Sequence, residues 1–250
     1  MFFLSKGDSS VSFKLINLIT ELLFPRCCPV CGDIVLPKGE LICPECFRKL
    51  SFVRQPACKK CGKEISDARQ EYCYDCSRHK RSFDYGLALL NYDDTSRTSM
   101  VKIKYKNKRE YLDFYAEAIW QRYSKQLLRI RPDVLIPVPV HPSRKRRRGF
   151  NQAEVLAELL GEKMNVPVAN DALLRSRKTA PQKQLGPAER LKNLSEAFVP
   201  GRRLTGVKRA LLVDDIYTTG STIEACTRIL KESGIPEIFF VTICIGRGKG

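Results

Sequence analysis

The most informative stretch of the chain is LLVDDIYTTGST, at residues 211–222. An apolar run ends there in Asp214 and Asp215, and a hydroxyl-rich turn around Gly220 leads into an amphipathic segment at 223–231. This order predicts a strand, a loop and a helix. Glycine lets the backbone approach a ligand closely, and the first turn of a helix presents unpaired N–H groups with partial positive charge. The loop is therefore expected to bind a phosphate.

The two carboxylates suit a different part of the same ligand, because they repel a phosphate. They fit the hydroxyls of an attached sugar, or a divalent cation beside it. A plain buried strand followed by a capped helix is the simpler alternative, but two aspartates at the end of a core strand are costly unless something satisfies them. Tyr217 either stacks on a base or packs in the core. The residues expected to hold the phosphate are Tyr217, Thr218, Thr219, Gly220, Ser221 and Thr222.

This segment resembles the phosphoribosyl-pyrophosphate (PRPP) motif of the type I phosphoribosyltransferase family. The resemblance implies that Asp214 and Asp215 are the catalytic pair, which holds the ribose 2′- and 3′-hydroxyls, and that the loop holds the 5′-phosphate. It also implies Mg²⁺ bound together with PRPP. The G-x-x-x-x-G-K-[ST] signature of nucleotide hydrolases does not occur in the sequence.

A cysteine pattern in the first third of the chain occurs twice. Each copy has two Cys-x-x-Cys pairs with the same internal spacing, and the copies start thirty residues apart, which marks a repeated small unit. Four thiolates from two such pairs form the tetrahedral site of a structural zinc ion. Equal spacing favours each copy closing on itself, while other pairings stay open. The expected ligands are Cys28, Cys31, Cys43 and Cys46 for one ion, and Cys58, Cys61, Cys73 and Cys76 for the other.

Disulfides are the competing interpretation of these cysteines, and they need an oxidising compartment. Residues 1–24 lack the basic tip and cleavage site of a secretion signal, so we expect a cytoplasmic protein with reduced thiols. The same segment carries an apolar helical face that docks on its own protein, on a partner or on the inner face of the membrane. We expect Cys27 to be spare, His79 to be a solvated loop residue, and Cys226 and Cys244 to lie in the core.

The remaining pattern predicts an α/β domain. Apolar runs at 83–92, 134–140, 209–213 and 238–245 read as strands, and segments 111–130 and 152–163 read as helices, with Trp120 in the core. Strands separated by helices imply a mostly parallel sheet flanked by helices, with ligands at the carboxyl ends of the strands. We therefore expect an N-terminal amphipathic helix at 1–25, a double zinc ribbon at 26–82 and the α/β domain at 83–250.

Positive charge is concentrated in the α/β domain. The whole chain has 44 basic and 27 acidic residues, a net charge of +17. Residues 26–82 carry 12 basic and 7 acidic side chains, and each zinc–thiolate site subtracts about two charges, so this module is nearly neutral. Residues 101–150 carry 14 basic and only 4 acidic side chains. This surface, rather than the ribbons, is expected to meet a polyanion such as pyrophosphate or nucleic acid.

The basic excess comes from two clusters. One surrounds Tyr105, and the other is a predicted loop just after the strand at 134–140. Counterion release from several phosphates would make any nucleic-acid binding steeply salt-dependent. The clusters are Lys102, Lys104, Lys106, Lys108 and Arg109, and then Arg144, Lys145, Arg146, Arg147 and Arg148.

A narrower resemblance covers residues 26–250. The segment IPVPVHPSRKRRRGFNQA at 136–153 is similar to the strand, basic loop and Arg-Gly-Phe-Asn-Gln-Ala segment of the ComF family of late-competence proteins. The stretch from Arg177 to Phe198, with Pro181-Gln182, resembles the loop that precedes the PRPP motif in that family, and Lys104-Tyr105-Lys106 also matches. A zinc-binding region ahead of a transferase-like domain belongs to the same pattern.

The ComF resemblance implies a cytoplasmic protein needed for the uptake of transforming DNA. It would work with a helicase-like ComF partner and membrane DNA-uptake machinery, and would bind PRPP or a related phosphate and single-stranded DNA. An active phosphoribosyltransferase that uses an unknown acceptor, as in nucleotide salvage, is the alternative; no residue that recognises an acceptor stands out. The resemblance assigns pyrophosphate or DNA contacts to Val138, Pro139, Arg144, Lys145, Arg146, Arg147, Arg148 and Lys104.

Overall fold

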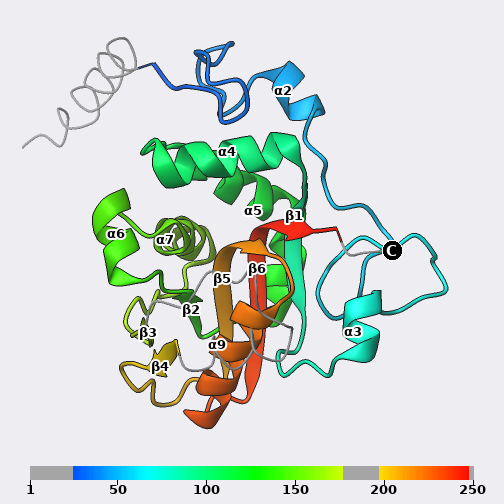
Figure 1. The fold of residues 1–250 in the computed structure, drawn as a ribbon, viewed down its shortest axis with the longest axis vertical. Helices are drawn as coiled ribbons and strands as arrows, with labels where there is room; N and C mark the ends of the chain where they lie inside the picture. Colours follow the sequence, from blue (N-terminus) through cyan, green and yellow to red (C-terminus); the bar gives the residue numbers. More distant parts are fainter. Residues whose placement is uncertain (1–24, 177–196, 248–250) are drawn as a thin grey trace, which may run out of the picture.

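The centre of the molecule is a four-stranded, all-parallel sheet with the strand order β1-β6-β5-β2 (Figure 1). The computed structural model describes residues 25–176 and 197–247. The strands are β1 (Gly86–Tyr92), β2 (Val134–Pro137), β5 (Arg209–Tyr217) and β6 (Glu237–Gly246). The two central strands, β5 and β6, are buried along almost their whole length, as expected for strands covered on both faces.

Alternate residues of the central strands face two separate cores. Leu211 and Val213 pack in one hydrophobic cluster, and Ala210 and Leu212 in the other, because successive side chains point to opposite sides of a strand. We call these the helical face and the loop face of the sheet. The helical face is covered by α4 (Asp94–Tyr105), α5 (Tyr111–Ile130) and α7 (Gln152–Met164), and the loop face by α9 (Ser221–Glu232) and the hairpin of β3 (Leu173–Arg175) and β4 (Phe198–Pro200).

Helices α4 and α7 begin where their sequences supply a side-chain cap. Asp93 and Ser96 form a reciprocal capping box at the start of α4, and Asn151 accepts a hydrogen bond from the amide of Ala153 at the start of α7. Such caps satisfy amides that have no partner inside the helix. The predicted helix at 111–130 matches α5, and Trp120 is half-buried against the core. Helix α4 was not among the predicted elements.

The basic segment at 144–148 was predicted as a loop, and this prediction is wrong. Residues Pro142–Arg148 form a short helix, α6. Pro142 occupies the first turn, where proline is tolerated, and the His141 side chain accepts a hydrogen bond from the Ser143 amide. Gly149 ends the helix in the left-handed region, at φ +84°.

Two predicted strand boundaries also shift. Strand β2 ends at Pro137 rather than at Val140. Pro139, inside the predicted strand, lacks the N–H that would continue the ladder. Strand β5 runs through Tyr217 rather than stopping at Val213. The two aspartates are therefore held in the sheet rather than in a loop, which fixes their backbone.

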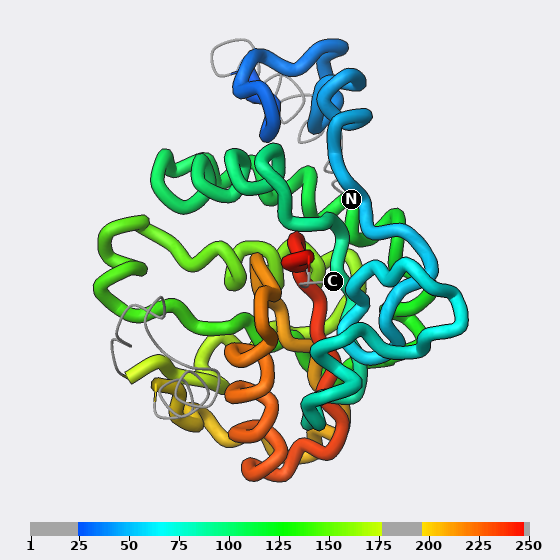
Figure 2. Tube along the Cα trace, turned by 45° about the vertical axis from the view of Figure 1, so that its right-hand side comes forward, coloured from blue at the N-terminus to red at the C-terminus, as the bar shows by residue number. Residues whose placement is uncertain are grey.

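The cysteine repeat folds as two copies of one unit. We call residues 26–50 ribbon 1 and residues 53–82 ribbon 2. The amide of the first cysteine donates to the carbonyl five residues later at 2.7 Å in both copies, from Cys28 to Asp33 and from Cys58 to Lys63. A short helix carries the last cysteine of each copy: α2 (Pro44–Arg48) and α3 (Tyr74–Arg78). In Figures 1 and 2, ribbon 1 lies over α4 while ribbon 2 lies beside β1.

Several predictions fall on parts of the chain that the structure does not describe. The amphipathic helix expected at 1–25 falls there, except for Pro25 itself, and so does most of the stretch from Arg177 to Phe198. Within residues 25–176 and 197–247, no helix has the length and apolar character needed to cross a bilayer.

Candidate functional site

Asp214 and Asp215 lie at the carboxyl end of β5, where ligands bind in parallel sheets. Asp214 is aligned with Thr242 of β6 in the ladder. The two aspartates are 9% and 6% exposed, so both carboxylates need partners to offset the loss of water. Their surroundings differ, and that difference defines the site.

Asp215 already has cationic and amide partners. Lys104, from the last turn of α4, forms an ion pair with its Oδ2, and Gln152 Nε2 donates to the same oxygen at 3.2 Å. Burial alone would raise the pKa of Asp215, but the Lys104 ammonium outweighs burial and holds that pKa below its ordinary value. The pKa of Lys104 is raised in turn: burial lowers it, and the attraction of Asp215 more than compensates. Asp215 is thus a fixed, ionised carboxylate.

Asp214 has much less compensation. Its Oδ1 accepts a hydrogen bond from the Asp215 amide at 2.8 Å, and the attraction of the Lys104 ammonium is a smaller influence on it than burial. Burial first, and then the neighbouring Asp215 charge, raise the pKa of Asp214 well above its ordinary value. Hydroxyl donors or a cation would relieve this cost, so Asp214 is the carboxylate that is suited to a ligand.

The hydroxyl-rich turn follows directly after the aspartates. Thr218 and Thr219 are exposed, and the Oγ atoms of Thr219 and Ser221 lie 2.9 Å apart. Gly220 adopts φ +78°, and a Cβ there would lie 2.2 Å from Tyr217 Oη, so only glycine fits. Helix α9 begins at Ser221 and points its free amides toward this turn. We call residues 218–222 the phosphate loop, after the ligand for which its groups are suited.

Tyr217 packs in the core rather than presenting its ring to a ligand. It is 3% exposed and stacks parallel to Phe240, with ring centroids 5.0 Å apart and an interplanar angle of 2°. Phe83 meets the same ring edge-on at 6.4 Å. Of the two roles left open by the sequence, packing is the one observed for the side chain.

Only some of the predicted basic residues reach the aspartates. Arg148 Nη1 donates to Gln152 Oε1 at 3.1 Å, which links it to Asp215 through Gln152. The other four residues of that cluster, 144–147, are exposed on α6, and Lys145 pairs with Glu154. Val138 is buried, and its amide donates to the carbonyl of Val213, beside Asp214; Pro139 follows it, half-buried.

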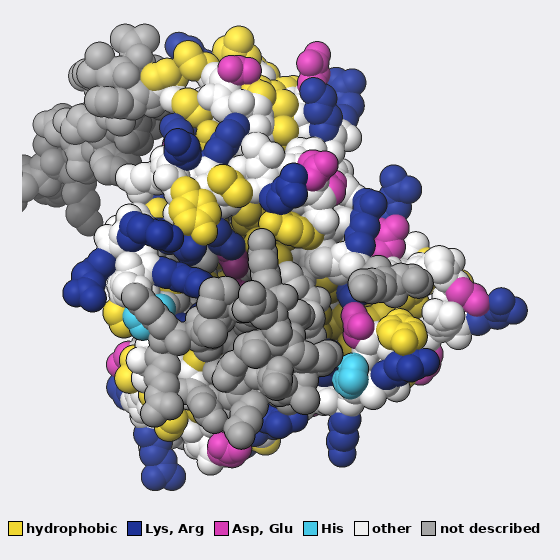
Figure 3. Space-filling model, in the orientation of Figure 1, with side chains coloured by type: hydrophobic (Ala, Val, Ile, Leu, Met, Phe, Trp, Pro, Cys, Tyr) yellow, Lys and Arg dark blue, Asp and Glu magenta, His cyan; other side chains and the backbone are white. Residues whose placement is uncertain are grey.

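Lys and Arg side chains gather over α4 and α6 in the space-filling view (Figure 3). The sequence predicted this concentration, but not that Lys104 and Gln152 would converge on one carboxylate. Gln152 belongs to the quoted Arg-Gly-Phe-Asn-Gln-Ala segment, which is the one signal that could have marked it.

Each ribbon gathers its own four cysteines, which confirms the self-closing pairing. The sulfur atoms of each group lie within 4.8 Å of one another, and Cys61 Sγ lies 3.6 Å from Cys73 Sγ. Four thiolates at the usual zinc–sulfur distance stand about 3.8 Å apart at the corners of a tetrahedron, so these residues fit structural zinc. Cys27 stays outside both groups, His79 is exposed, and Cys226 and Cys244 are buried, as expected.

Ribbon 2 also reaches the phosphate loop, a contact that the sequence did not indicate. Arg81 Nη2 donates to the Thr219 carbonyl at 2.9 Å. The amide and hydroxyl of Ser82 donate to the two carboxylate oxygens of Glu224, at 2.9 and 2.7 Å. Glu224 lies in the first turn of α9 and is 1% exposed. Burial would raise the pKa of Glu224, but the Ser82 and Arg228 hydrogen bonds lower it below the ordinary value.

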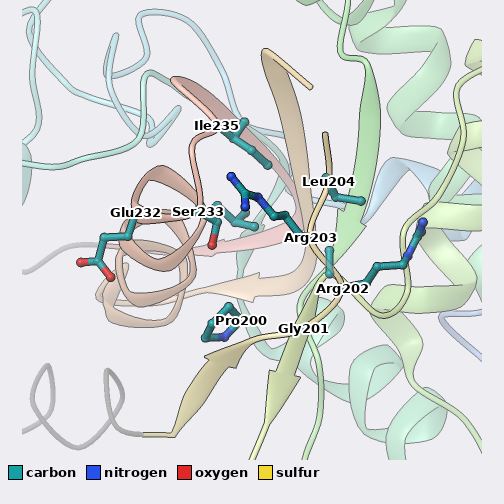
Figure 4. Close-up of a pocket in the computed structure, with 10 residues that line it drawn as sticks. Pro200, Gly201, Arg202, Arg203, Leu204, Glu232, Ser233 and Ile235 are labelled. Carbon is teal, nitrogen blue, oxygen red and sulfur yellow. The ribbon is translucent and has the colours of Figure 1, made fainter. Parts of the chain in front are cut away.

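A cavity of about 380 Å³ lies at the opposite edge of the sheet (Figure 4). Its walls come from the segment after β4 and from the end of α9, and Arg203 reaches across it toward Ser233 and Ile235. This edge holds the amino ends of the strands. The cavity is therefore not part of the site at the aspartates.

Comparisons with known proteins agree with this architecture. A family model described as a double zinc ribbon domain matches residues 19–77, and one described as a phosphoribosyl transferase domain matches residues 104–250. Competence protein F of Haemophilus influenzae is 36% identical over 109 residues, which cover 43% of this chain and 48% of that protein. Competence protein ComFC of Bacillus subtilis is 28% identical over 237 residues, which cover 93% of this chain and 82% of that protein.

DNA utilization protein YhgH of Escherichia coli is 33% identical over 118 residues, which cover 45% of this chain and 49% of that protein. The chain thus spans about half the length of the Haemophilus and Escherichia relatives. Among solved structures, a purine phosphoribosyltransferase from Pyrococcus horikoshii Ot3 aligns with a TM-score of 0.34 and 19% identity, over 54% of this chain and 72% of that chain. The predicted fold class is confirmed by the sheet topology and the two family models. The chain belongs to the ComF family, with a double zinc ribbon ahead of a phosphoribosyl transferase domain.

Proposed function

We propose that this chain binds PRPP, or a related phosphate, together with Mg²⁺ at the carboxyl edge of β5. We further propose that it acts in the cytoplasm in the uptake of transforming DNA, and that it binds single-stranded DNA on the basic surface of α4 and α6. The observation that carries the proposal is the buried pair of unequal aspartates beside a glycine turn and the start of a helix.

Each part of the site has a role in this proposal. Asp214 accepts hydrogen bonds from ribose hydroxyls, while Lys104 and Gln152 hold Asp215 ionised and in place. The hydroxyls and amides of the phosphate loop bind the 5′-phosphate. Pyrophosphate lies toward Val138, Pro139 and Arg148. Bound Mg²⁺ would supply positive charge beside the pyrophosphate, and the Asp214 carboxylate is the protein group suited to face it.

The DNA part of the proposal rests on charge and on the relatives. Positions 101–150 hold 14 basic residues. An enzyme that acts on a small molecule does not need so many, whereas a protein that binds the phosphates of a nucleic-acid strand does. The names of the relatives, competence proteins and a DNA utilization protein, point the same way. The helicase-like ComF partner and the membrane uptake machinery come into the proposal with the family. An active phosphoribosyltransferase is the alternative, and it would release pyrophosphate from PRPP.

Replacing both aspartates tests the ligand site. Asp214→Asn together with Asp215→Asn should abolish PRPP binding in calorimetry, because amides cannot replace two carboxylate acceptors or attract Mg²⁺. Zinc content should stay the same. Asp94→Asn is the matched control, since the Asp94 side chain is 92% exposed on the first turn of α4. Retained affinity in the double variant would place the ligand elsewhere.

A salt series with single-stranded DNA tests the second part. Each phosphate contact contributes about 0.7 to the slope of log affinity against log salt, so replacing residues 144–147 by glutamine should reduce the slope by up to about 3. Arg148 is kept, because it binds Gln152. Glutamine at the exposed residues Lys59, Arg69, Arg78 and Lys80 of ribbon 2 removes the same charge elsewhere. Weak, salt-insensitive binding by the wild type, with pyrophosphate release from PRPP, would favour the enzyme alternative.

A further inference from the structure

Tyr105 is an exposed aromatic ring among cations. It ends α4 with 56% of its surface exposed. The guanidinium carbons of Arg147 and Arg148 lie 5.7 and 5.2 Å from its ring centroid. Both arginines come from the end of α6, so one helix brings two positive charges to a ring carried by another.

Packing of α4 does not require this ring. The helix buries Ser96, Ser99, Met100 and Ile103 against the sheet. Tyr105 is outside that face, with Val101, also exposed, one helical turn before it. More than half of the Tyr105 surface is exposed to solvent, so burial of this side chain contributes little to stability. Core packing therefore does not explain its position.

The ring also stands next to the aspartate site. Lys104, the preceding residue, pairs with Asp215, and Arg148 reaches Asp215 through Gln152. Arg148 Nε is buried and has no hydrogen-bond partner in the described part of the chain. A buried guanidinium donor without a partner is costly, and a phosphate oxygen would satisfy it.

We propose that Tyr105 is a stacking platform for a nucleobase of single-stranded DNA, with Arg147 and Arg148 contacting the adjoining phosphates. This inference rests on the proposed DNA binding and names the group that meets the bases. Aromatic rings that stack on bases beside a positively charged track bind single strands with little sequence preference, because every base has a π-face. The platform would bring the strand to the rim of the phosphoribosyl site.

The test compares a normal strand with one that lacks bases. Tyr105→Ala and Tyr105→Phe are measured by fluorescence anisotropy with an oligothymidylate, and with an abasic oligonucleotide of the same length and charge. Tyr105→Ala should weaken binding of the oligothymidylate by roughly 5- to 100-fold, should leave the abasic strand nearly unaffected, and should leave PRPP affinity unchanged. Tyr105→Phe should bind both strands like the wild type, because it keeps the ring.

Tyr74→Ala is the matched control. Tyr74 is 59% exposed in α3 of ribbon 2, away from α4 and α6, and the Arg78 guanidinium carbon lies 4.5 Å from its ring centroid. It should behave like the wild type. Equal losses on the two strands, or no loss on either, would overturn the platform and leave the DNA proposal standing. A wild-type protein that binds neither strand would remove the DNA proposal itself. Equally tight, Tyr105-dependent binding of thymidine monophosphate would make the ligand a mononucleotide and overturn the assignment to a strand.

Discussion

The two zinc ribbons have the same cysteine spacing and the same turns, but they pack on opposite faces of the sheet. Ribbon 1 contributes Cys28, Val35 and Leu50 to the core of the helical face. Ribbon 2 contributes Val53, Cys61 and Ile65 to the core of the loop face. The two ribbons therefore have the same local fold but pack against different elements. Each zinc ion stabilises the face of the sheet on which its ribbon packs.

The ribbons also balance their metal charge differently. A zinc ion with four thiolates carries a net charge of about −2. In ribbon 2 the residue after Gly62 is Lys63, which is buried beside Cys61 and Cys73 and pairs with Asp75 at 2.7 Å. Ribbon 1 has Asp33 at the equivalent position. Its cation comes instead from α4, where Lys102 Nζ donates to the carbonyls of Val30 and Cys31 at 3.0 and 3.1 Å.

These contacts divide the functional site between the ribbons. Ribbon 2 reaches the phosphate loop through Arg81 and the start of α9 through Ser82. Ribbon 1 holds Lys102, two residues before Lys104 and three before Tyr105. We therefore expect ribbon 2 to affect the phosphate ligand and ribbon 1 to affect the DNA surface.

The largest difference is expected from removing one zinc ion at a time. Cys61→Ser and Cys31→Ser should each reduce zinc content from about two ions per chain to about one. Cys61 is fully buried and Cys31 is exposed, so Cys61→Ser should lower the unfolding temperature more. It should also weaken PRPP binding by roughly tenfold or more, since the contacts to the phosphate loop and Glu224 are each worth about 1 kcal/mol.

Cys31→Ser is the control for metal loss by itself. It should keep PRPP affinity within about threefold of the wild type, because within residues 25–176 and 197–247 no hydrogen bond or ion pair joins ribbon 1 to the phosphate loop. Metal analysis, thermal unfolding and calorimetry measure these quantities on the same samples. Equal effects of the two variants on PRPP affinity would contradict the division between the ribbons.

A smaller and cleaner contrast comes from single contacts that leave both zinc sites intact. Ser82→Ala removes the hydroxyl that donates to buried Glu224 at 2.7 Å, which should cost about 1–3 kcal/mol of stability and weaken PRPP binding. Lys102→Ala removes two hydrogen bonds to ribbon 1 at the surface, which should cost about 1 kcal/mol and leave PRPP affinity unchanged. Denaturant unfolding measures the change in stability, and calorimetry measures the change in PRPP affinity. If Lys102→Ala weakened PRPP binding as much as Ser82→Ala, ribbon 1 would also support the phosphate site.

The sequence predicted the elements whose signals are local. The helix at 111–130, the repeated zinc unit and the buried strand at 238–245 follow from periodicity and spacing, and the structure has all three. The segment at 144–148 was misread because a run of like charges argues for a loop. Pro142 and Gly149, which start and end α6, were the signals that outweighed it.

The candidate site was predictable only in part. Asp214, Asp215 and the phosphate loop adjoin in sequence, so one strand–turn–helix pattern identified them. Lys104 and Gln152 come from separate helices and converge on Asp215 only after the sheet has formed. Arg81 lies 138 positions from Thr219, and nothing in the local pattern of either segment joins them. Contacts of this kind follow from topology rather than from propensity.

A structure of the zinc-replete protein with PRPP and Mg²⁺ bound would decide whether the ligand binds between Asp214 and the phosphate loop. We expect ribose hydroxyls within hydrogen-bond distance of Asp214, the 5′-phosphate on the amides and hydroxyls of residues 218–222, and an unbroken contact between Arg81 and Thr219. A ligand that occupied the cavity beside Arg203, or that left Asp214 without a new partner, would contradict it.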